Sequence, residues 1–317
     1  MAVVTGAAGA AGPAGPAARD LAAARGRRRS RVAYLFLAPW ILGVLGLTLG
    51  PMLASLYLSF TDYRLSGAPS WVGPANYQRM LGDDPRFWTS VGVTVRYVVL
   101  SVPLQLAFAL AIAVFLDRGV RGLALYRSVY YLPSLLGSSV AVAVLWRRLF
   151  SSDGLVVELA GTVGIQLSGG WISDPDRALD TLLVLNVWTF GSPMVIFLAG
   201  LRQIPGELVE AAKVDGAGAL QRFFRVVFPL LTPVVFFNLI LQLIGAFQAF
   251  TPAYIVSAGT GGPADSTLFY TLYLFQSGFQ AFDMGYASAM AWGLFAVIGA
   301  ITALNFAASR YWVHYGD

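Results

Sequence analysis

Residues 203–233, QIPGELVEAAKVDGAGALQRFFRVVFPLLTP, form a polar and charged segment between two long apolar runs. A proline and a glycine precede two acidic residues, Glu207 and Glu210, and Gly216 follows them. Carboxylates favour the first turn of a helix and glycine favours its C-terminal cap. The segment therefore predicts a short helix over residues 206–215.

One face of this predicted helix carries small and polar side chains. Leu208, Ala211, Ala212 and Asp215 recur at i, i+3, i+4 and i+7, so they fall on one side. Small residues there allow another protein to approach closely. The segment is either an ordinary loop between membrane spans or a docking element through which a separate motor drives those spans.

The composition indicates a polytopic membrane protein. Apolar residues make up 57% of the 317 positions and charged residues 12%, with a mean hydropathy of +0.68. A soluble domain carries about 25% charged residues. The absence of cysteine excludes disulfides and thiolate metal sites, and His314 is the only histidine. We therefore expect no metal and no cofactor.

Six apolar runs are long enough to cross the roughly 30 Å hydrocarbon core of a bilayer. They cover residues 32–60, 87–116, 127–150, 178–201, 226–250 and 285–309. The predicted fold is all-α, a polytopic membrane protein with six transmembrane helices. Prolines within or near most runs predict kinks, which survive in a bilayer only where other groups satisfy the freed carbonyls.

The distribution of basic residues predicts the orientation. With both termini inside, fourteen Lys and Arg residues lie on the inner side and six on the outer side, while Arg96 lies within a span. This excess agrees with the positive-inside rule and puts residues 203–233 in the cytoplasm. The basic N-terminal tail is then a membrane-surface feature, and we expect no nucleic-acid binding.

The spans lack the groups that catalysis or ion coupling requires. No Asp, Glu, His or Lys lies well inside an apolar run, which argues against an intramembrane hydrolase and an ion-coupled carrier. Lys213 is the only lysine and no Gly-x-x-x-x-Gly precedes it, so the chain has no Walker A phosphate loop. We expect that the chain is not an enzyme, and that any energy for transport comes from another subunit.

The segment EAAKVDGAGALQRFFRVVFP resembles the EAA loop of permease subunits of binding-protein-dependent ABC importers. That motif reads Glu-Ala-Ala, three residues, Gly, nine residues, then apolar–x–apolar–Pro. Its counterparts here are Glu210, Ala211, Ala212, Gly216, Val226, Phe228 and Pro229. Val226 and Phe228 replace the usual Ile and Leu.

Further stretches resemble the carbohydrate-uptake type of these permeases, of the maltose or glycerol-phosphate kind with a MetI-like transmembrane domain. They are WVGPANYQRML with a following FW, residues 126–150, WISDP, FLAGLRQIP and AGTGGPADST. Together they cover about residues 34 to 310. The resemblance implies a bacterial or archaeal cytoplasmic membrane protein.

The resemblance also implies partners and a division of the chain. The partners are a second permease subunit, an ABC ATPase dimer and an extracytoplasmic sugar-binding protein. The expected division is a disordered basic tail (1–31), a first span with its outer loop (32–86), the permease core (87–310) and a cytoplasmic C-terminus (311–317). In this division, residues 206–215 form the coupling helix.

Three groups of site residues follow from the resemblance and from residue chemistry. For ATPase coupling they are Glu207, Glu210, Ala211, Ala212, Asp215, Gly216, Arg222 and Pro229. For a translocation path with amide, hydroxyl and aromatic partners for sugars, they are Asn186, Thr189, Asn238, Gln242, Gln248, Phe247 and Phe250. For contact with the binding protein they are Tyr77, Gly261, Gly262 and Pro263.

Other functions stay open at this point. The chain could be a membrane scaffold or sensor that docks an ATPase without forming a pore, or an importer subunit for a solute other than a sugar. The polar residues of the spans could equally form interhelical hydrogen bonds. The sequence does not identify the substrate, and the partner permease could carry most of the substrate contacts.

Overall fold

The computed structural model describes residues 36–314 except 66, 120–121, 138 and 163–169. The predicted tail, residues 1–31, lies outside the described residues. The chain separates into two compact units, residues 1–57 and 58–317. Each unit is described by itself.

The described part of the first unit is one apolar helix, the candidate span Phe36–Leu58, whose last residue belongs to the second unit. It contains a π-helical stretch, η1 (Val44–Leu49), followed by α2 (Gly50–Leu58). The N–H of Gly50 bonds to the carbonyl of Leu45, five residues back. Large apolar side chains are exposed along the helix, as expected for a segment surrounded by lipid.

The regular elements of the second unit are all helices among its described residues. Two isolated bridges, Thr61 with Trp71 and Arg64 with Asp283, are its only strand-like pairings there. Its elements are α3 (Ala75–Gln78), η2 (Arg79–Asp83), α4 (Pro85–Asp117), α5 (Leu123–Leu136), α6 (Val140–Leu149), α7 (Leu155–Thr162), α8 (Ala178–Trp188), α9 (Gly191–Leu201), α10 (Gly206–Val214), α11 (Ala219–Arg222), η3 (Phe223–Val227), α12 (Phe228–Phe247), α13 (Thr251–Val256), α14 (Tyr270–Phe275), η4 (Gln276–Gln280) and α15 (Met284–Trp312). The predicted all-α fold is confirmed.

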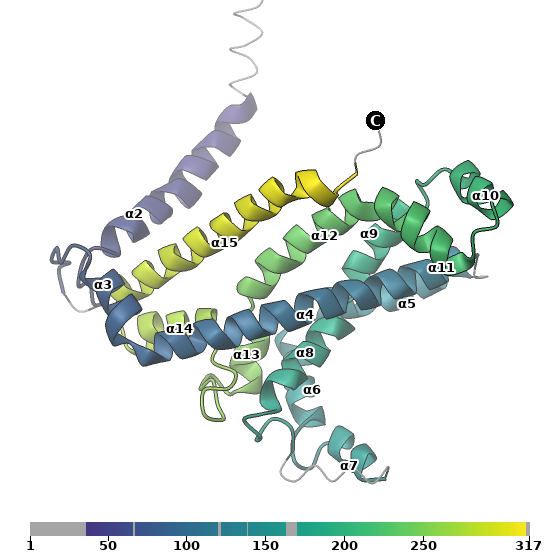
Figure 1. The fold of residues 1–317 in the computed structure, drawn as a ribbon. Coiled ribbons are helices and arrows are strands. Elements are labelled where there is room, and N and C mark those ends of the chain that lie inside the picture. Colours follow the sequence, from purple (N-terminus) through teal and green to yellow (C-terminus); the bar gives the residue numbers. More distant parts are fainter. Residues whose placement is uncertain (1–35, 66, 120–121, 138, 163–169, 315–317) are drawn as a thin grey trace, which may run out of the picture. The chain divides into compact units, whose positions relative to one another are not determined.

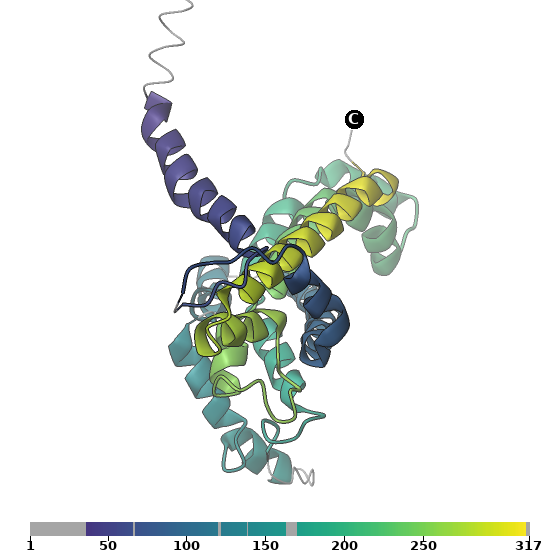
Figure 2. The same ribbon diagram turned by 90° about the vertical axis from the view of Figure 1, so that its left-hand side faces the viewer.

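The long helix α4 is the centre of this unit and contacts α8, α9, α12 and α14 (Figure 1). It begins sharply because Asp84 caps it and Pro85 takes its first position, where no N–H is needed. The α3–η2 segment lies at its first end and α10 with α11 near its last end (Figure 1), and α3 also lies beside α15 (Figure 2). One helix thus links two differently built ends of the unit.

Four described helices are long and apolar enough to cross a membrane, and six spans result if each of two bent helix pairs is one span. The bent pairs are α5 with α6 and α8 with α9, the latter bent by 41°. The six predicted spans agree with this upper number. The two runs expected as single helices, 127–150 and 178–201, are instead broken near their middle.

The break between α8 and α9 has a local cause. Pro193 has no N–H to offer the carbonyl of Thr189 four residues earlier. The hydroxyl of Ser134 donates to that carbonyl at 2.8 Å and the amide of Gln105 at 3.3 Å. Gly191 allows α9 to approach α5 closely, because a Cβ there would overlap the carbonyl oxygen of Tyr130. Side chains of other helices therefore satisfy the freed backbone group.

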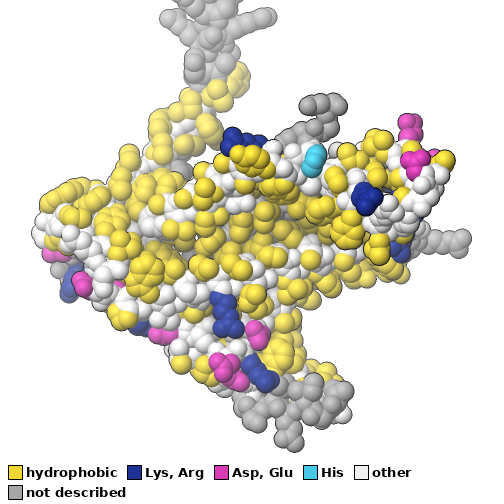
Figure 3. All heavy atoms as spheres, viewed as in Figure 1, with side chains coloured by type: hydrophobic (Ala, Val, Ile, Leu, Met, Phe, Trp, Pro, Cys, Tyr) yellow, Lys and Arg dark blue, Asp and Glu magenta, His cyan; other side chains and the backbone are white. Residues whose placement is uncertain are grey.

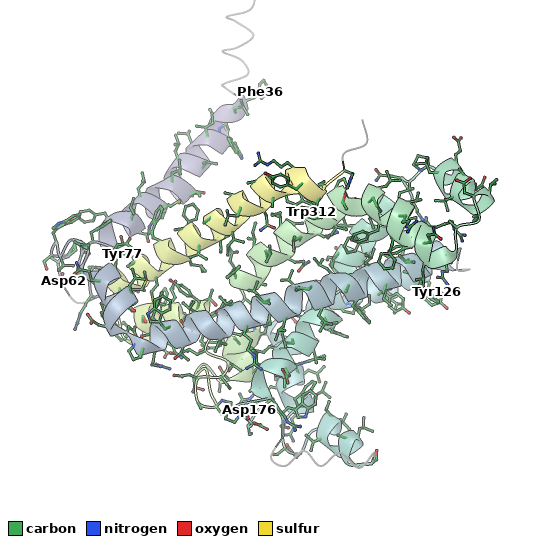
Figure 4. The ribbon with its side chains drawn as sticks, in the orientation of Figure 1. Phe36, Asp62, Tyr77, Tyr126, Asp176 and Trp312 are labelled. Carbon is green, nitrogen blue, oxygen red and sulfur yellow. The ribbon has the colours of Figure 1, made fainter. Side chains whose placement is uncertain are left out.

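The turn that precedes α12 is a π-helix, also because of a proline. Pro229 offers no N–H to the carbonyl of Arg225, and the preceding turn is the π-helix η3. The N–H of Phe228 bonds to Phe223, five residues back. Further along, Phe236 packs against Trp312 with ring centroids 6.0 Å apart, so the end of α15 lies against α12 (Figure 4).

Hydrophobic side chains cover most of the visible surface over α4, α12 and α15 (Figure 3). Examples from α4 and α15 are Val99, 62% exposed, and Leu304, 68% exposed. Such large exposed apolar side chains in long helices are expected where the surrounding solvent is lipid rather than water.

Candidate functional site

A cavity of about 410 Å³ lies where α4, α8, α9 and α12 meet. Amide, hydroxyl and aromatic side chains line it, together with small and apolar ones. They are Tyr97, Gln105, Ser134, Gly137, Leu182, Leu185, Asn186, Thr189, Ser192, Gln242, Gly245, Ala246, Gln248, Ala249, Phe250, Thr251 and Pro252. Among these lining residues none is charged.

One wall of the cavity is a hydrogen-bonded network at the α8–α9 break. The amide of Gln105 donates to the hydroxyl of Thr189 at 3.0 Å and accepts from the amide of Asn186 at 3.1 Å. The hydroxyl of Thr189 donates to the carbonyl of Asn186 at 2.7 Å. Ser134 accepts from the N–H of Ser192 at 2.9 Å. Polar groups are therefore held in fixed positions inside an otherwise apolar bundle.

Five of the seven residues predicted for a translocation path line this one cavity: Asn186, Thr189, Gln242, Gln248 and Phe250. The remaining two lie elsewhere. Asn238 is buried and donates to the carbonyl of Val234 at 3.2 Å. Phe247 lines a separate cavity of about 300 Å³ with apolar walls. The role of all seven residues in translocation stays a prediction.

Four further polar side chains line the cavity that sequence did not predict for it: Gln105, Ser134, Ser192 and Tyr97. Gln105 is 2% exposed and comes from α4, 81 residues before its partner Asn186. A glutamine within an apolar run is itself a signal, because a buried amide needs partners. The sequence alone could not identify those partners.

The predicted short helix is α10, and its end has the geometry that Gly216 indicated. Gly216 has φ of +79°, a conformation that favours glycine. Its N–H bonds to Lys213 and the N–H of Ala217 bonds to Ala212, both at 3.0 Å. These two bonds are the Schellman motif, which ends a helix and turns the chain.

The outer surface of α10 and α11 is unusually apolar for a loop between spans. Val209 and Ala212 are half-buried against the bundle, while Leu208 is exposed. Val214 is 88% exposed and Leu220 75% exposed. The acidic side chains Glu207, Glu210 and Asp215 are also exposed, and none of them forms an ion pair within the described chain.

Two other residues of the predicted coupling group have structural roles. Arg222 donates to the carbonyl of Ala217 at 2.6 Å and so ties α11 to the turn that follows α10. Pro229 lies at the start of α12, after the π-helical turn. Coupling itself stays a prediction for the whole group.

At the opposite end of α4, Asp84 is the centre of a buried hydrogen-bond network. One carboxylate oxygen caps α4 by accepting from the N–H groups of Arg86 and Phe87. The other oxygen accepts from the hydroxyls of Tyr273 at 2.5 Å and Tyr286 at 2.6 Å. Asp84 is 9% exposed, so these bonds replace water around its charge.

Two arginine–aspartate pairs flank this carboxylate. Arg79 pairs with Asp283 at 2.7 Å and lies over the ring of Tyr286, 4.1 Å from its centroid. Arg86 donates to both carboxylate oxygens of Asp265, at 2.8 and 3.0 Å. The network therefore joins η2, α4, the loop before α14, α14 itself and the start of α15.

Hydrogen bonds favour the ionised form of the Asp84 carboxyl group. Burial alone would raise the pKa of its carboxyl group, but the two tyrosine hydroxyls and the two backbone N–H groups outweigh burial and hold the pKa below its ordinary value of 3.8. Asp84 is therefore ionised at neutral pH.

The residues predicted to contact a binding protein are partly engaged within the chain. The hydroxyl of Tyr77 bonds to Ser59 at 2.8 Å. Gly261 is buried, with φ of +81°, and its carbonyl accepts from the N–H of Thr267 at 3.0 Å. Gly262 and Pro263 are half-buried. Contact with a binding protein stays a prediction.

A family model described as "Binding-protein-dependent transport system inner membrane component" matches residues 84–313, which is more than half of the chain. The chain is also 52% identical to the probable ABC transporter permease protein YesP of Bacillus subtilis (strain 168), over 91% of this chain and 94% of YesP. It is 34% identical to the lactose transport system permease protein LacF of Rhizobium radiobacter, over 87% of this chain and 93% of LacF.

The fold resembles a chain of the bacterial alginate ABC transporter solved in complex with an alginate pentasaccharide-bound periplasmic protein. The TM-score is 0.77 at 19% identity, covering 90% of this chain and 96% of that chain. At this identity the likeness concerns the fold alone.

The chain belongs to the family of binding-protein-dependent transport system inner membrane components. It is a multi-pass membrane permease subunit of an ABC importer. In this family the ATPase is a separate component, so the chain is not itself the enzyme.

Proposed function

We propose that this subunit forms half of the translocation path of an ATP-driven sugar importer and that α10 couples the path to the ATPase. The observation that carries this proposal is the uncharged polar cavity at the α8–α9 break. The partners are a second permease subunit, which is a different chain, an ABC ATPase dimer and an extracytoplasmic sugar-binding protein.

The chemistry of the cavity supports a neutral, hydroxyl-rich solute. Gln242 and Gln248 have no side-chain hydrogen bond within the described chain, so their amides remain for a solute. Phe250 adds an aromatic face, which suits sugar rings. The lactose permease among the relatives agrees with this class of solute.

The surface of α10 supports its role as the coupling helix. Its exposed apolar side chains and its unpaired Glu207 and Glu210 together suit a protein cleft with both apolar and basic groups. Ala211 permits close approach, and the Schellman turn at Gly216 fixes the direction in which the chain leaves.

The proposed orientation puts α10 and both termini in the cytoplasm, because the basic residues are concentrated on that side. The Asp84 end of α4 then faces outward, where Tyr77 and the loop that contains Gly261–Pro263 would meet the binding protein. The proposed division of the chain is that given by the sequence, with the permease core at residues 87–310.

The test is sugar uptake by the complete importer in proteoliposomes, with the binding protein first titrated against a sugar panel to identify the ligand. We expect uptake that requires ATP and the binding protein and that is insensitive to ionophores. A complex that hydrolyses ATP without moving any ligand of its binding protein would support the scaffold alternative instead.

Two variants separate the path from the coupling helix. Gln242→Leu combined with Gln248→Leu removes the free amides and is expected to lower uptake at least tenfold, while Gln280→Leu, an exposed amide outside the cavity, leaves it unchanged. Glu210→Lys is expected to abolish uptake while the subunit still inserts and assembles. Normal uptake by Glu210→Lys at normal expression would remove the coupling proposal but not the path.

A further inference from the structure

A third cavity, of about 730 Å³, lies on another side of α4 between its last turns and the segment that follows α10. Its walls are mostly apolar. They consist of Ala107, Leu110, Ala111, Val114, Asp117, Arg118, Leu201, Val209, Ala219, Leu220, Arg222, Phe223, Phe224, Val227 and Phe228.

Three charged residues line this cavity, Asp117, Arg118 and Arg222, and they leave an excess of positive charge. Asp117 pairs with Arg202 at 3.6 Å. Arg118 forms no ion pair among the described residues, and Arg222 makes one bond, to the carbonyl of Ala217. Two guanidinium groups therefore lie at the cavity with donors to spare and no carboxylate assigned to them.

The depth of the cavity indicates what kind of molecule fits it. Its lining along α4 runs from Arg118 back to Ala107, which is about 16 Å at 1.5 Å per residue. In the proposed orientation, Arg118 lies where α4 reaches the cytoplasmic surface of the membrane, so Ala107 lies among the acyl chains of the bilayer. A soluble protein docked at α10 would not reach Ala107, whereas an acyl chain spans this distance.

The neighbouring surface has the character of a membrane interface. Leu220 and Phe224 are 75% and 62% exposed, one helical turn apart, and Arg222 and Arg225 lie beside them in sequence. Apolar side chains next to arginines in a short helical segment are typical of a segment that lies in the headgroup region.

We propose that this cavity binds an anionic phospholipid of the inner leaflet. Its acyl chain occupies the apolar part beside Ala107, Ala111 and Val114, and its phosphate contacts Arg118 and Arg222. Arginine binds phosphate with parallel N–H donors, and basic pockets between spans on the cytoplasmic side suit anionic headgroups. The proposed transport path does not require this lipid site. The lipid site and the transport path depend on the same proposed orientation, with α10 in the cytoplasm, and are otherwise independent proposals.

The position of the site connects the lipid to the coupling segment. Val209 of α10 lines the cavity, and Arg222 holds the turn after α10 through Ala217. A bound lipid therefore fills the space between α10 and the end of α4. Without the lipid, α10 has less support from the span that it is proposed to drive.

The test measures lipid retention by the assembled importer. The complex is exchanged into mixed palmitoyl-oleoyl phosphatidylglycerol and phosphatidylcholine, delipidated by gel filtration, and analysed by native mass spectrometry. The charge variant is Arg118→Gln with Arg222→Gln, and its control is Arg225→Gln with Arg310→Gln, which removes two charges on the same side but outside the cavity.

One arginine near an anionic surface contributes about 1 kcal/mol, or roughly fivefold in affinity. We therefore expect retained phosphatidylglycerol to fall roughly 25-fold relative to phosphatidylcholine in the charge variant and less than about threefold in the control. Ala111→Trp, which fills the apolar part without changing charge, is expected to lower retention of both lipids. Because Ala111 is exposed, this substitution also tests the site if the charge variant assembles poorly.

Three results would overturn the proposal. One is equal retention by the charge variant and its control together with unchanged retention in Ala111→Trp. Another is displacement of the bound molecule by inorganic phosphate or glycerol phosphate, which would indicate an anion site without an acyl chain. The third is a photo-crosslinker at position 111 that captures the ATPase subunit instead of a phospholipid.

Discussion

The two ends of α4 are built in opposite ways. At the first end, Asp84 is buried and all its hydrogen-bond partners come from the same chain. At the last end, Arg118 lies at an open cavity, and Leu220 and Phe224 are exposed nearby. One end is closed by intramolecular contacts, and the other leaves surface uncovered for partners outside the chain.

This difference separates stability from coupling along one helix. The Asp84 network joins segments about 180 to 200 residues apart, so breaking it exposes buried polar groups in several elements at once. By contrast, α10 contacts mainly its neighbours in sequence, α11 and η3. Substitutions at the first end should therefore act on stability, and those at the second end on transport.

The largest stability effect is expected for Asp84→Ala. It removes the cap of α4, which contributes about 1 kcal/mol, and leaves two buried tyrosine hydroxyls without an acceptor, at about 1–3 kcal/mol each. We expect the free energy of unfolding to fall by about 3–7 kcal/mol, measured as a lower melting temperature of the purified complex. Asp84→Asn keeps an acceptor oxygen, so its free energy of unfolding should fall less than that of Asp84→Ala. An equal fall in both variants would show that the charge of Asp84, and not its hydrogen bonding, stabilises the fold.

At the other end, Gly216→Val is expected to reduce uptake at least tenfold with little change in melting temperature. A β-branched residue at φ of +79° costs about 1–3 kcal/mol locally and disfavours the turn after α10. Gly218→Ala is the matched control, because Gly218 has φ of −66° and a Cβ there meets no atom within 4 Å. Gly216→Asn should retain more uptake than Gly216→Val, since asparagine tolerates positive φ.

A smaller effect is expected for the ion pairs that flank Asp84. Arg86→Gln removes a bidentate pair with Asp265 whose side chains are 47% and 30% exposed, so the loss should be about 0.5–1 kcal/mol. The difference in stability between wild type and Arg86→Gln should shrink when salt is raised from about 0.1 M to 1 M, because the electrostatic screening length falls from about 10 to 3 Å. Arg148→Gln, which breaks a more exposed pair with Asp153, should change the melting temperature less.

The smallest effect near neutral pH is a pH dependence at Asp84. Because its folded pKa lies below 3.8, its ionised form stabilises the fold above the unfolded pKa, and this contribution is lost as the pH falls through the folded pKa. The stability difference between wild type and Asp84→Asn should therefore be constant from about pH 5 to 8 and shrink below about pH 4. A difference that grows on acidification would contradict the assigned hydrogen bonds.

The features that sequence predicted correctly are local or periodic. Apolar runs predicted the spans, and Gly216 predicted the end of α10 because helix termination depends on neighbouring residues. Residue chemistry also selected Asn186, Thr189, Gln242 and Gln248, which the structure brings to one cavity, but it selected Asn238 and Phe247 as well, which lie elsewhere.

The features that sequence missed depend on residues far apart in the chain. The residues around Asp84 in sequence indicate only a helix cap, and none of them indicates that Tyr273 or Tyr286 donates to it. The α8–α9 break was expected only as a kink at Pro193, because a full break needs the outside donors Gln105 and Ser134. A proline shows that a carbonyl is freed, but tertiary structure decides what satisfies it.

The freed carbonyl of Thr189 also bears on how long a solute stays in the cavity. It already accepts hydrogen bonds from Ser134 and Gln105, and the amide of Asn186 already donates to Gln105. A wall whose donors and acceptors are mutually satisfied gains little from holding a passing molecule. In the proposed path this wall would let a sugar pass without holding it, and the free amides of Gln242 and Gln248 would supply the contacts.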